Sequence, residues 1–279
     1  MRVLILGARG MLGKDLVPIA SAKNQVLGRD IDDFDIADQE RVQKELIALR
    51  PQVVINAAGY TDVDGCESRR ELAFSVNAEG ARNIALGCAI IGARMIHLST
   101  DYVFDGSSRV PYREEDLPHP LNVYGSSKLQ GERYIQEILE NYLIIRTEWL
   151  YGRHGKNFVD TILRNATQQE ELRVVDDQRG APTFTKDLSS AIDRLIGIDA
   201  RGILHVTSSG SCTWCEFARQ ILREKKPANR AVQIVPISST ELARPARRPA
   251  YSLMDCQRYE QLTGSKMRPW EEALKEYLS

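Results

Sequence analysis

The strongest indication of the fold is the stretch RVLILGARGMLG, residues 2–13. The apolar run over residues 2–7 predicts a strand buried on both faces, and a helix is predicted to follow over residues 11–20. Gly7, Gly10 and Gly13 stand between and within these two elements. Glycines at this spacing let the backbone approach a pyrophosphate closely, and the free N–H groups of a helix N-terminus attract that anion. The stretch therefore predicts a dinucleotide-binding turn after the first strand.

The same alternation of apolar runs and helical stretches continues to about residue 150. Further strands are predicted over residues 25–29, 53–56, 95–99 and 142–146, with helices over residues 39–49, 71–91 and 123–139. This rhythm indicates an α/β fold, a Rossmann-type doubly wound parallel sheet with helices on both faces. We therefore predict an NAD(P)-binding domain over residues 1–150.

Residues 151–279 have a looser pattern, which predicts a smaller, interleaved substrate-binding lobe with segments that return to the sheet. Strands are predicted there over residues 172–176, 203–207 and 233–237, with helices over residues 158–167, 187–197, 213–224 and 270–277. Cys212 and Cys215 form a C-x-x-C pair in this half, but no second pair at zinc spacing accompanies them. We expect both thiols to pack in the lobe rather than to bind a metal.

The composition is that of an ordinary globular protein. The chain has 279 residues, of which 43% are apolar and 27% charged, and its net charge is −1. Bulk charge therefore gives no attraction to nucleic acid or to an anionic membrane. No run approaches the roughly 18 apolar residues of a membrane span, and the start of the chain does not read as a signal peptide. These features predict a cytoplasmic protein without nucleic-acid or membrane partners.

Asp30 ends the second predicted strand, where an acidic side chain accepts a hydrogen bond from the ribose of a dinucleotide. Arg29 beside it and Arg9 in the glycine turn are placed to bind a 2′-phosphate instead. Both cofactors therefore remain open, with NADPH favoured and NADH possible. The third predicted strand ends in small residues that leave room for a cofactor, although close packing on a helix would also explain them. These residues are Ala57, Ala58 and Gly59.

Thr100 ends the fourth predicted strand, and Tyr124 and Lys128 open the next helix one turn apart. An isolated tyrosine has a pKa near 10, and a nearby ammonium group lowers that pKa because it stabilises the phenolate. Such a pair is suited to exchanging a proton with a substrate oxygen that Thr100 orients. Because Y-x-x-x-K is common by chance, it gains weight only from following the glycine turn and the strand-end hydroxyl.

In this order, the motifs resemble those of the extended short-chain dehydrogenases/reductases over most of the chain. The finer motifs are NAAGYTDVDGCE (56–67), STDYVFDG (99–106), NVYGSSKLQGE (122–132), RTEWLYG (146–152), DDQRGAPT (176–183) and ARPARRPAYS (243–252). Together they are similar to the dTDP-4-dehydrorhamnose reductase family. The resemblance implies NAD(P)H-dependent reduction of the 4-keto group of dTDP-6-deoxy-L-lyxo-4-hexulose to dTDP-L-rhamnose, the last step of dTDP-rhamnose synthesis for bacterial cell-surface polysaccharides.

The resemblance also implies roles for the matching residues. Cofactor contacts would come from Gly10, Met11, Leu12, Asp30, Asp35, Ile36, Ala57, Ala58, Gly59, Tyr124 and Lys128. The dTDP-sugar would lie against Thr61, Val63, Thr100, Asp101, Tyr102, Trp149, Asn157 and Phe158, with Arg247 or Arg248 facing its diphosphate. For Trp149, a packed core aromatic remains the alternative.

Some members of that family hold magnesium between subunits on glutamate side chains. Asp15 stands at one such position here, but Lys186 stands near another, and an ammonium group is a poor neighbour for a cation. We therefore predict that the protein binds no metal and is a monomer or a weak homodimer.

Other functions on the same fold remain open. A reductase of another 4-keto nucleotide sugar would share most of these motifs. A nucleotide-sugar 4,6-dehydratase would need a second acid after Asp101, and residue 102 is tyrosine. A 4-epimerase would have to reoxidise its own tightly held NADH. A noncatalytic relative, such as the regulatory subunit of methionine adenosyltransferase, would not need Thr100, Tyr124 and Lys128, which are all present.

Overall fold

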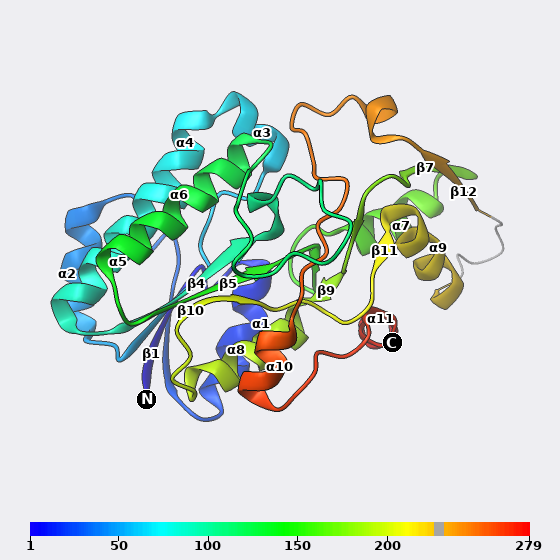
Figure 1. The fold of residues 1–279 in the computed structure, drawn as a ribbon. Helices are drawn as coiled ribbons and strands as arrows, with labels where there is room; N and C mark the ends of the chain where they lie inside the picture. The colour runs from blue at the N-terminus through cyan, green and yellow to red at the C-terminus, as the bar shows by residue number, and fades with distance from the viewer. Residues whose placement is uncertain (226–231) are drawn as a thin grey trace.

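A parallel sheet forms the centre of the molecule in the computed structural model, which describes residues 1–225 and 232–279 (Figure 1). Its strand order among these residues is β10-β5-β4-β3-β1-β2, and every neighbouring pair is parallel. The predicted doubly wound α/β fold is thereby confirmed. The strands are β1 (Arg2–Leu6), β2 (Gln25–Arg29), β3 (Val53–Asn56), β4 (Arg94–Thr100), β5 (Tyr142–Thr147) and β10 (Gly202–His205).

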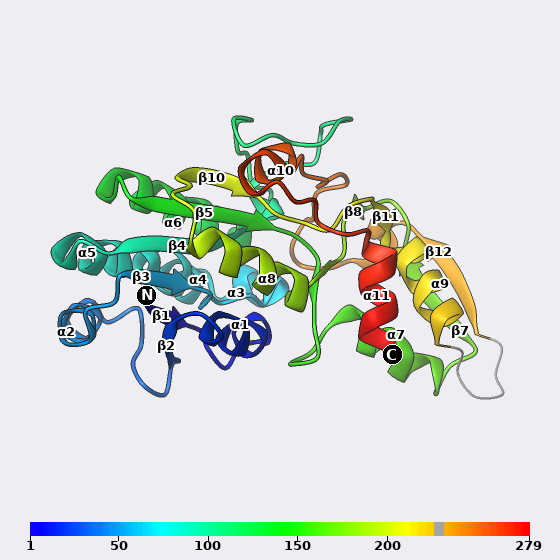
Figure 2. The same ribbon diagram turned by 90° about the horizontal axis from the view of Figure 1, so that it is seen from below.

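Alternate residues of β1 build two separate cores, one on each face of the sheet. Val3 and Ile5 pack with the helices α1 (Met11–Ser21) and α8 (Thr185–Ile196). Leu4 and Leu6 point to the other face, because successive side chains of a strand alternate. Helices cover both faces, as Figure 2 also shows. The helices on the second face are α2 (Gln39–Leu49), α5 (Gly80–Ile91) and α6 (Val123–Ile138).

The helix predicted over residues 71–91 is divided in the structure. A short helix α4 (Arg70–Phe74) leads into a π-helical turn, Ser75–Glu79, before α5 begins. The extra residue of a π turn redirects side chains, and such turns are frequent at functional sites. Here Asn77 faces Tyr60, where it accepts from the backbone N–H at 2.8 Å and donates to the carbonyl at 3.0 Å. The turn thereby fixes the loop that follows β3.

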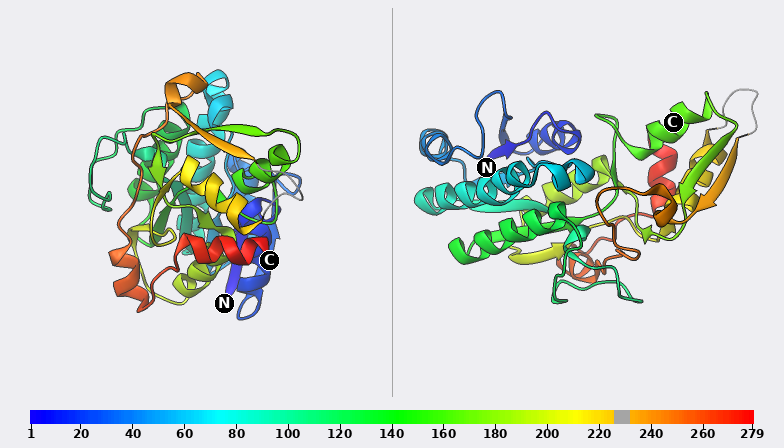
Figure 3. Two further views of the ribbon diagram at one scale, coloured as in Figure 1. Left: turned by 90° about the vertical axis from the view of Figure 1, so that its right-hand side faces the viewer. Right: turned by 90° about the horizontal axis from the view of Figure 1, so that it is seen from above.

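The second lobe packs around its own aromatic core beside the sheet (Figure 3). Two parallel strands pair within it, β7 (Glu171–Val175) and β12 (Gln233–Ile237). Its helices are α7 (Phe158–Ala166), α9 (Trp214–Glu224) and α11 (Trp270–Leu278). Cys212 and Cys215 are buried in this lobe as free thiols, which confirms the packing predicted for them.

Segments after residue 150 also complete the first half. Strand β10 extends the sheet beside β5, and α8 packs on α1. Arg94, at the start of β4, donates to the carbonyls of Leu195 at 2.9 Å, Ile198 at 2.8 Å and Ala200 at 2.7 Å, at and just beyond the end of α8.

Two short helices were not predicted, α3 (Val63–Ser68) and α10 (Gln257–Thr263). Both are shorter than the windows in which a helical period can be recognised. In the described part of the chain, we find no helix whose length and apolar character would let it cross a membrane.

Candidate active site

The turn between β1 and α1 has the shape of an anion cradle. Gly7 adopts φ +78°, and a Cβ atom there would lie 2.7 Å from the Ala58 nitrogen. A Cβ atom on Gly13 would collide with the Gly7 carbonyl. Gly10 caps α1 without any side-chain hydrogen bond, so the first N–H groups of the helix keep their hydrogen-bonding capacity. The residues present therefore fit the pyrophosphate of a dinucleotide.

A hollow of about 450 Å³ lies beside this turn, at the end of β2. Asp30 stands at its edge, where its carboxylate accepts from the backbone N–H of Arg9 at 2.7 Å and of Ile31 at 2.9 Å. The Arg9 guanidinium is exposed and pairs with Asp32 at 3.0 Å. Basic side chains therefore line the position predicted for the adenosine end of the cofactor. They are Arg9, Lys14 and Arg29.

Two of the residues predicted for the adenosine side have structural contacts outside this lining. Ile36 is buried against Gly80, which places it in the core under α5. Asp35 accepts from the backbone N–H of Ala37 at 2.9 Å and is exposed. Both lie after β2, at the edge of the sheet where a bound adenosine would end.

Thr100, Tyr124 and Lys128 meet at the carboxyl end of β4. Tyr124 lies near Thr100, and both it and Lys128 stand in the first turns of α6. Asn122 begins this helix, because its side chain accepts from the backbone N–H of Gly125 at 2.8 Å. Gly125 in turn lies directly on the Tyr102 carbonyl, where no larger residue fits. The start of α6 is thereby held against the end of β4, and the predicted trio comes together.

The expected effect of Lys128 on Tyr124 is wrong for this arrangement. The Lys128 ammonium donates to the Leu98 carbonyl at 2.6 Å and lies 3.3 Å from His97. Burial lowers the pKa of Lys128 to about 8. The pKa of Tyr124 is raised rather than lowered, because the protein around it and the Asp101 carboxylate disfavour the phenolate.

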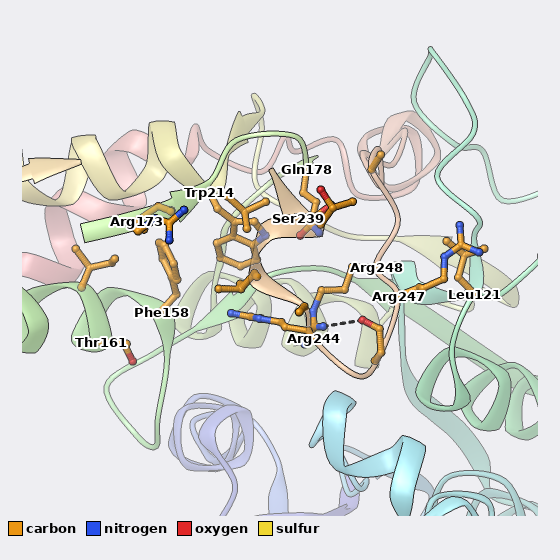
Figure 4. Close-up of a pocket in the computed structure, with 18 of the residues that line it drawn as sticks. Leu121, Phe158, Thr161, Arg173, Gln178, Trp214, Ser239, Arg244, Arg247 and Arg248 are labelled. Carbon is orange, nitrogen blue, oxygen red and sulfur yellow. Dashed lines mark hydrogen bonds between the residues drawn. The ribbon is translucent and has the colours of Figure 1, made fainter. Parts of the chain in front are cut away.

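A pocket of about 780 Å³ opens between the two halves of the chain (Figure 4). Phe158 and Trp214 line one end of it, and Arg173 lies beside them. Arg244 and Arg248 extend into its middle, so that cations surround a space with an aromatic end. Such a lining suits a ligand with a flat ring and a diphosphate.

The structure distinguishes the two arginines that the sequence left open. Arg248 makes two hydrogen bonds to the Asp64 carboxylate, at 3.0 and 2.9 Å, and its charge lies near the Tyr102 hydroxyl. The Tyr102 ring lies 5.8 Å from that of Tyr124, so Arg248 connects the pocket with the trio. Arg247 also lines the pocket, but Figure 4 shows its side chain near Leu121, away from the aromatic end.

The other residues predicted to contact the dTDP-sugar do not all line the pocket. Phe158 lines the pocket, whereas Trp149 stacks on Trp214 with ring centroids 3.6 Å apart. Asn157 caps α7, and its amide also donates to the Gly152 carbonyl and to Asp160, so its hydrogen bonds are made within the protein. Thr61 is exposed just before α3, and Val63 is the first residue of that helix.

The absence of an acid directly after Asp101 does not mean that Asp101 is far from other acids. Residue 102 is indeed tyrosine, but Glu148, which follows β5, lies beside Asp101. The Ser252 hydroxyl donates to Glu148 at 3.0 Å and stabilises the Asp101 carboxylate as well. Two buried acids therefore stand under Thr100.

Some residues of the candidate site were not singled out in the sequence, although the motifs that contain them were. Glu148 lies within RTEWLYG, and Arg244 lies within ARPARRPAYS. Asp64 likewise lies within NAAGYTDVDGCE, whereas Trp214 had no distinguishing signal, because a single aromatic in a helix is usually packing.

The two side chains considered for magnesium binding, Asp15 and Lys186, make contacts with other protein side chains. Asp15 accepts a hydrogen bond from Thr185 and lies 3.7 Å from His154. Lys186 pairs with Glu276 at 2.6 Å. Within residues 1–225 and 232–279, the structure contains no group of three or more His, Cys, Asp or Glu side chains arranged to hold a metal ion.

Comparison with known proteins gives matches along the whole chain. The family described as RmlD substrate binding domain matches residues 1–279. A dTDP-4-dehydrorhamnose reductase of Streptomyces griseus is 41% identical over 286 residues, covering 99% of this chain and 92% of the relative. A dTDP-4-keto-6-deoxy-D-glucose reductase of Streptomyces niveus is 38% identical over 275 residues, covering 98% of this chain and 95% of the relative. The crystal structure of dTDP-4-dehydrorhamnose reductase from Bacillus anthracis in complex with NADP has a TM-score of 0.94 at 40% identity, covering 99% of this chain and 98% of that one.

Proposed function

Since the chain belongs to the dTDP-4-dehydrorhamnose reductase family, we propose that it reduces the 4-keto group of dTDP-6-deoxy-L-lyxo-4-hexulose to give dTDP-L-rhamnose. The observation that carries this proposal is the placement of Tyr124, near the start of α6, beside Thr100 at the end of β4. The pair stands at the carboxyl end of a Rossmann-type sheet, where ligands of such sheets bind.

The cofactor fits the cradle described above, with its pyrophosphate against the N-terminus of α1. When bound, NAD(P)H supplies a hydride to the ketone carbon. Gly10, Met11 and Leu12 would hold the pyrophosphate through backbone N–H groups. Ala57, Ala58 and Gly59 leave space over the end of β3 because their side chains are small or absent. Tyr124 and Lys128 would hold the ribose next to the nicotinamide.

The sugar oxygen receives its proton from Tyr124. Reduction places negative charge on that oxygen, and a donor already aimed at it stabilises the charge as it develops. Thr100 orients the same oxygen through its hydroxyl group. Arg244 and Arg248 neutralise the diphosphate of the substrate, while Phe158 and Trp214 pack against its base. The lining of the pocket supports these roles.

The choice of sugar is tested with and without the 3,5-epimerase that inverts the 4-keto intermediate. Purified protein, NADPH and dTDP-4-keto-6-deoxy-D-glucose are mixed, and the nicotinamide absorbance is followed. We expect absorbance to fall only after epimerase is added. A fall without epimerase would instead assign the activity named for the Streptomyces niveus relative, reduction of dTDP-4-keto-6-deoxy-D-glucose.

The reductase should consume its cofactor in proportion to product. We expect one NAD(P)H to be oxidised for each sugar reduced, and we expect the protein to purify without tightly bound NAD. Incubation with dTDP-glucose and no reductant should leave the sugar unchanged when it is analysed by chromatography. A 4-keto-6-deoxy product in that tube would assign a dehydratase, for which Asp101 and Glu148 would supply the acids.

Cofactor choice should depend on the basic hollow beside Asp30. If Arg9 or Arg29 binds the 2′-phosphate, its replacement by alanine should raise KM for NADPH by roughly 10- to 150-fold and leave KM for NADH nearly unchanged. Arg41→Ala is the matched control, since Arg41 pairs with Glu45 on the surface of α2. Equal changes for both cofactors in the two test variants would show that neither arginine recognises the phosphate.

Four expectations from the sequence remain predictions. The protein is expected to be cytoplasmic, to act without nucleic-acid or membrane partners, and to be a monomer or a weak homodimer. The division at residue 150 is kept as a functional one, in which residues 1–150 bind the cofactor and residues 151–279 mainly bind the substrate.

A further inference from the structure

The arginine loop, residues 244–248, lines the substrate pocket with its three arginines and is hydrogen-bonded to the first half of the chain (Figure 4). Asp64 of α3 accepts from the Ala246 N–H at 3.2 Å and from the Arg248 guanidinium at 3.0 and 2.9 Å. The same guanidinium donates to the Ala246 carbonyl at 2.9 Å, which closes the loop on itself. These contacts give the arginine loop a defined shape at the wall of the pocket.

Asn122 joins this loop to the helix that carries Tyr124. It begins α6, where its side-chain oxygen accepts from the Gly125 N–H at 2.8 Å, and its side-chain nitrogen donates to the Arg247 carbonyl at 2.7 Å. These partners define the two ends of the amide, because a backbone N–H can only donate and a carbonyl can only accept. The side chain is 6% exposed. One buried amide group therefore fixes the arginine loop at a set distance from the first turn of α6.

A sugar nucleotide has to be held at two places for its ketone to react. In the proposed function, the arginines bind the diphosphate, and Tyr124 gives a proton to the oxygen of the ketone. Binding energy at a remote group raises the rate only when that group is held in a fixed position relative to the reacting atoms. A misplacement of about 1 Å can lower a rate by roughly 100-fold. The distance between the arginine loop and α6 therefore matters more for the reaction than for binding of the nucleotide alone.

We propose that Asn122 is a positioning residue, which sets the distance between the arginines that bind the diphosphate and the hydroxyl group of Tyr124. It acts through the Arg247 backbone on one side and through the first turn of α6 on the other. Asp64 holds the same loop from α3, so loss of the Asn122 contact shifts the loop without releasing it. The inference rests on the proposed reduction of a sugar nucleotide.

Asn122→Ser tests this role, because serine also begins helices well but has no amide nitrogen to donate to the Arg247 carbonyl. We expect kcat for reduction of the 4-keto sugar to fall by roughly 10- to 100-fold. The Kd for dTDP alone, measured by isothermal titration calorimetry, should stay within about twofold of the wild type, because dTDP has no ketone to align. An unchanged kcat would overturn the proposal, and so would a Kd for dTDP that rises as much as kcat falls.

Two further variants make this comparison specific. Asp38→Ser is the matched control, because Asp38 begins α2 by accepting from the Arg41 N–H at 3.0 Å, and the pocket lining comes from other elements. Its kcat and its Kd for dTDP should both remain at the wild-type values. Asn122→Asp also keeps the start of α6, but at pH 8 its ionised carboxylate sets a second acceptor against the Arg247 carbonyl. Its kcat should fall at least as far as that of Asn122→Ser, and a wild-type kcat would contradict the proposal.

A second readout needs no substrate. Hydrogen–deuterium exchange of the free protein should be at least about tenfold faster over residues 244–248 in Asn122→Ser than in the wild type, and unchanged there in Asp38→Ser. Unchanged exchange in Asn122→Ser would show that Asn122 does not hold the arginine loop, and the inference would fail. Faster exchange in a protein that reduces no 4-keto sugar would instead overturn the proposed function alone.

Discussion

Tyr124→Phe should lower kcat by a factor of roughly 10² to 10⁴, the usual contribution of a positioned acid or base. The ring would remain against Tyr102, where the two centroids are 5.8 Å apart, so packing changes little. Only the hydroxyl group near Thr100 is lost. Without it, the developing negative charge on the sugar oxygen has no donor with a transferable proton. The measurement is steady-state reduction of the 4-keto sugar, with NADPH binding followed separately by protein fluorescence.

Tyr102→Phe is the matched control for this experiment. It removes a neighbouring hydroxyl group, but one that lies near the Arg248 guanidinium. We expect its effect to fall mainly on KM for the sugar nucleotide, because Arg248 lines the substrate pocket. NADPH binding should change little in either variant. A Tyr124→Phe enzyme that works at nearly the wild-type rate would remove Tyr124 as the proton donor.

Arg146→Met should reduce the free energy of unfolding by about 3–5 kcal/mol, the usual cost of leaving a buried charge without its partner. Arg146 and Glu132 are 1% and 0% exposed, and the guanidinium donates to both carboxylate oxygens, at 3.0 and 2.6 Å. The pair joins β5 to α6, the helix that carries Tyr124 and Lys128. Loss of the arginine would leave the Glu132 carboxylate with the Ser99 hydroxyl as its remaining side-chain hydrogen-bond donor among the described residues. Urea unfolding followed by circular dichroism measures the change.

The double variant Glu132→Leu/Arg146→Met separates the cost of an unpaired charge from the cost of lost packing. Replacing a whole buried ion pair by apolar side chains is often nearly neutral. The double variant should therefore be more stable than Arg146→Met alone. If both proteins lose the same free energy of unfolding, the destabilisation comes from packing, and the charge argument fails.

The first half of the fold could be predicted because its signals are local. The apolar run before Gly7 and the glycines that follow specify a strand, a tight turn and a helix within a short stretch, and neighbouring strands repeat the pattern. The π turn at Ser75–Glu79 could not be foreseen, since it depends on Asn77 reaching the backbone of Tyr60 from another segment. Local propensity contains no information on such a contact.

The candidate site also contains residues that could be predicted from the sequence and contacts that could not. Thr100, Tyr124 and Lys128 could be identified because their order and spacing follow the strand–helix rhythm. The orientation of Lys128 toward Leu98 and the proximity of Asp101 to Glu148 could not, because both depend on how β4, β5 and α6 pack. Arg244 and Trp214 entered the pocket lining for a similar reason, since the second lobe brings them there from segments far apart in the sequence.

The pairing of β10 with β5 has a consequence for the order in which the protein can fold during synthesis. Residues 1–150 leave the ribosome without α8, so the apolar face of α1 has no cover and the guanidinium of Arg94 lacks its carbonyl partners. The outer edge of β5 also remains open until residues 202–205 have been made. An unpaired strand edge and exposed apolar surface are the features through which partly folded chains associate. The nascent cofactor-binding half is therefore a natural client for chaperones, and a chain cut at residue 150 should accumulate as aggregate rather than as a free-standing module.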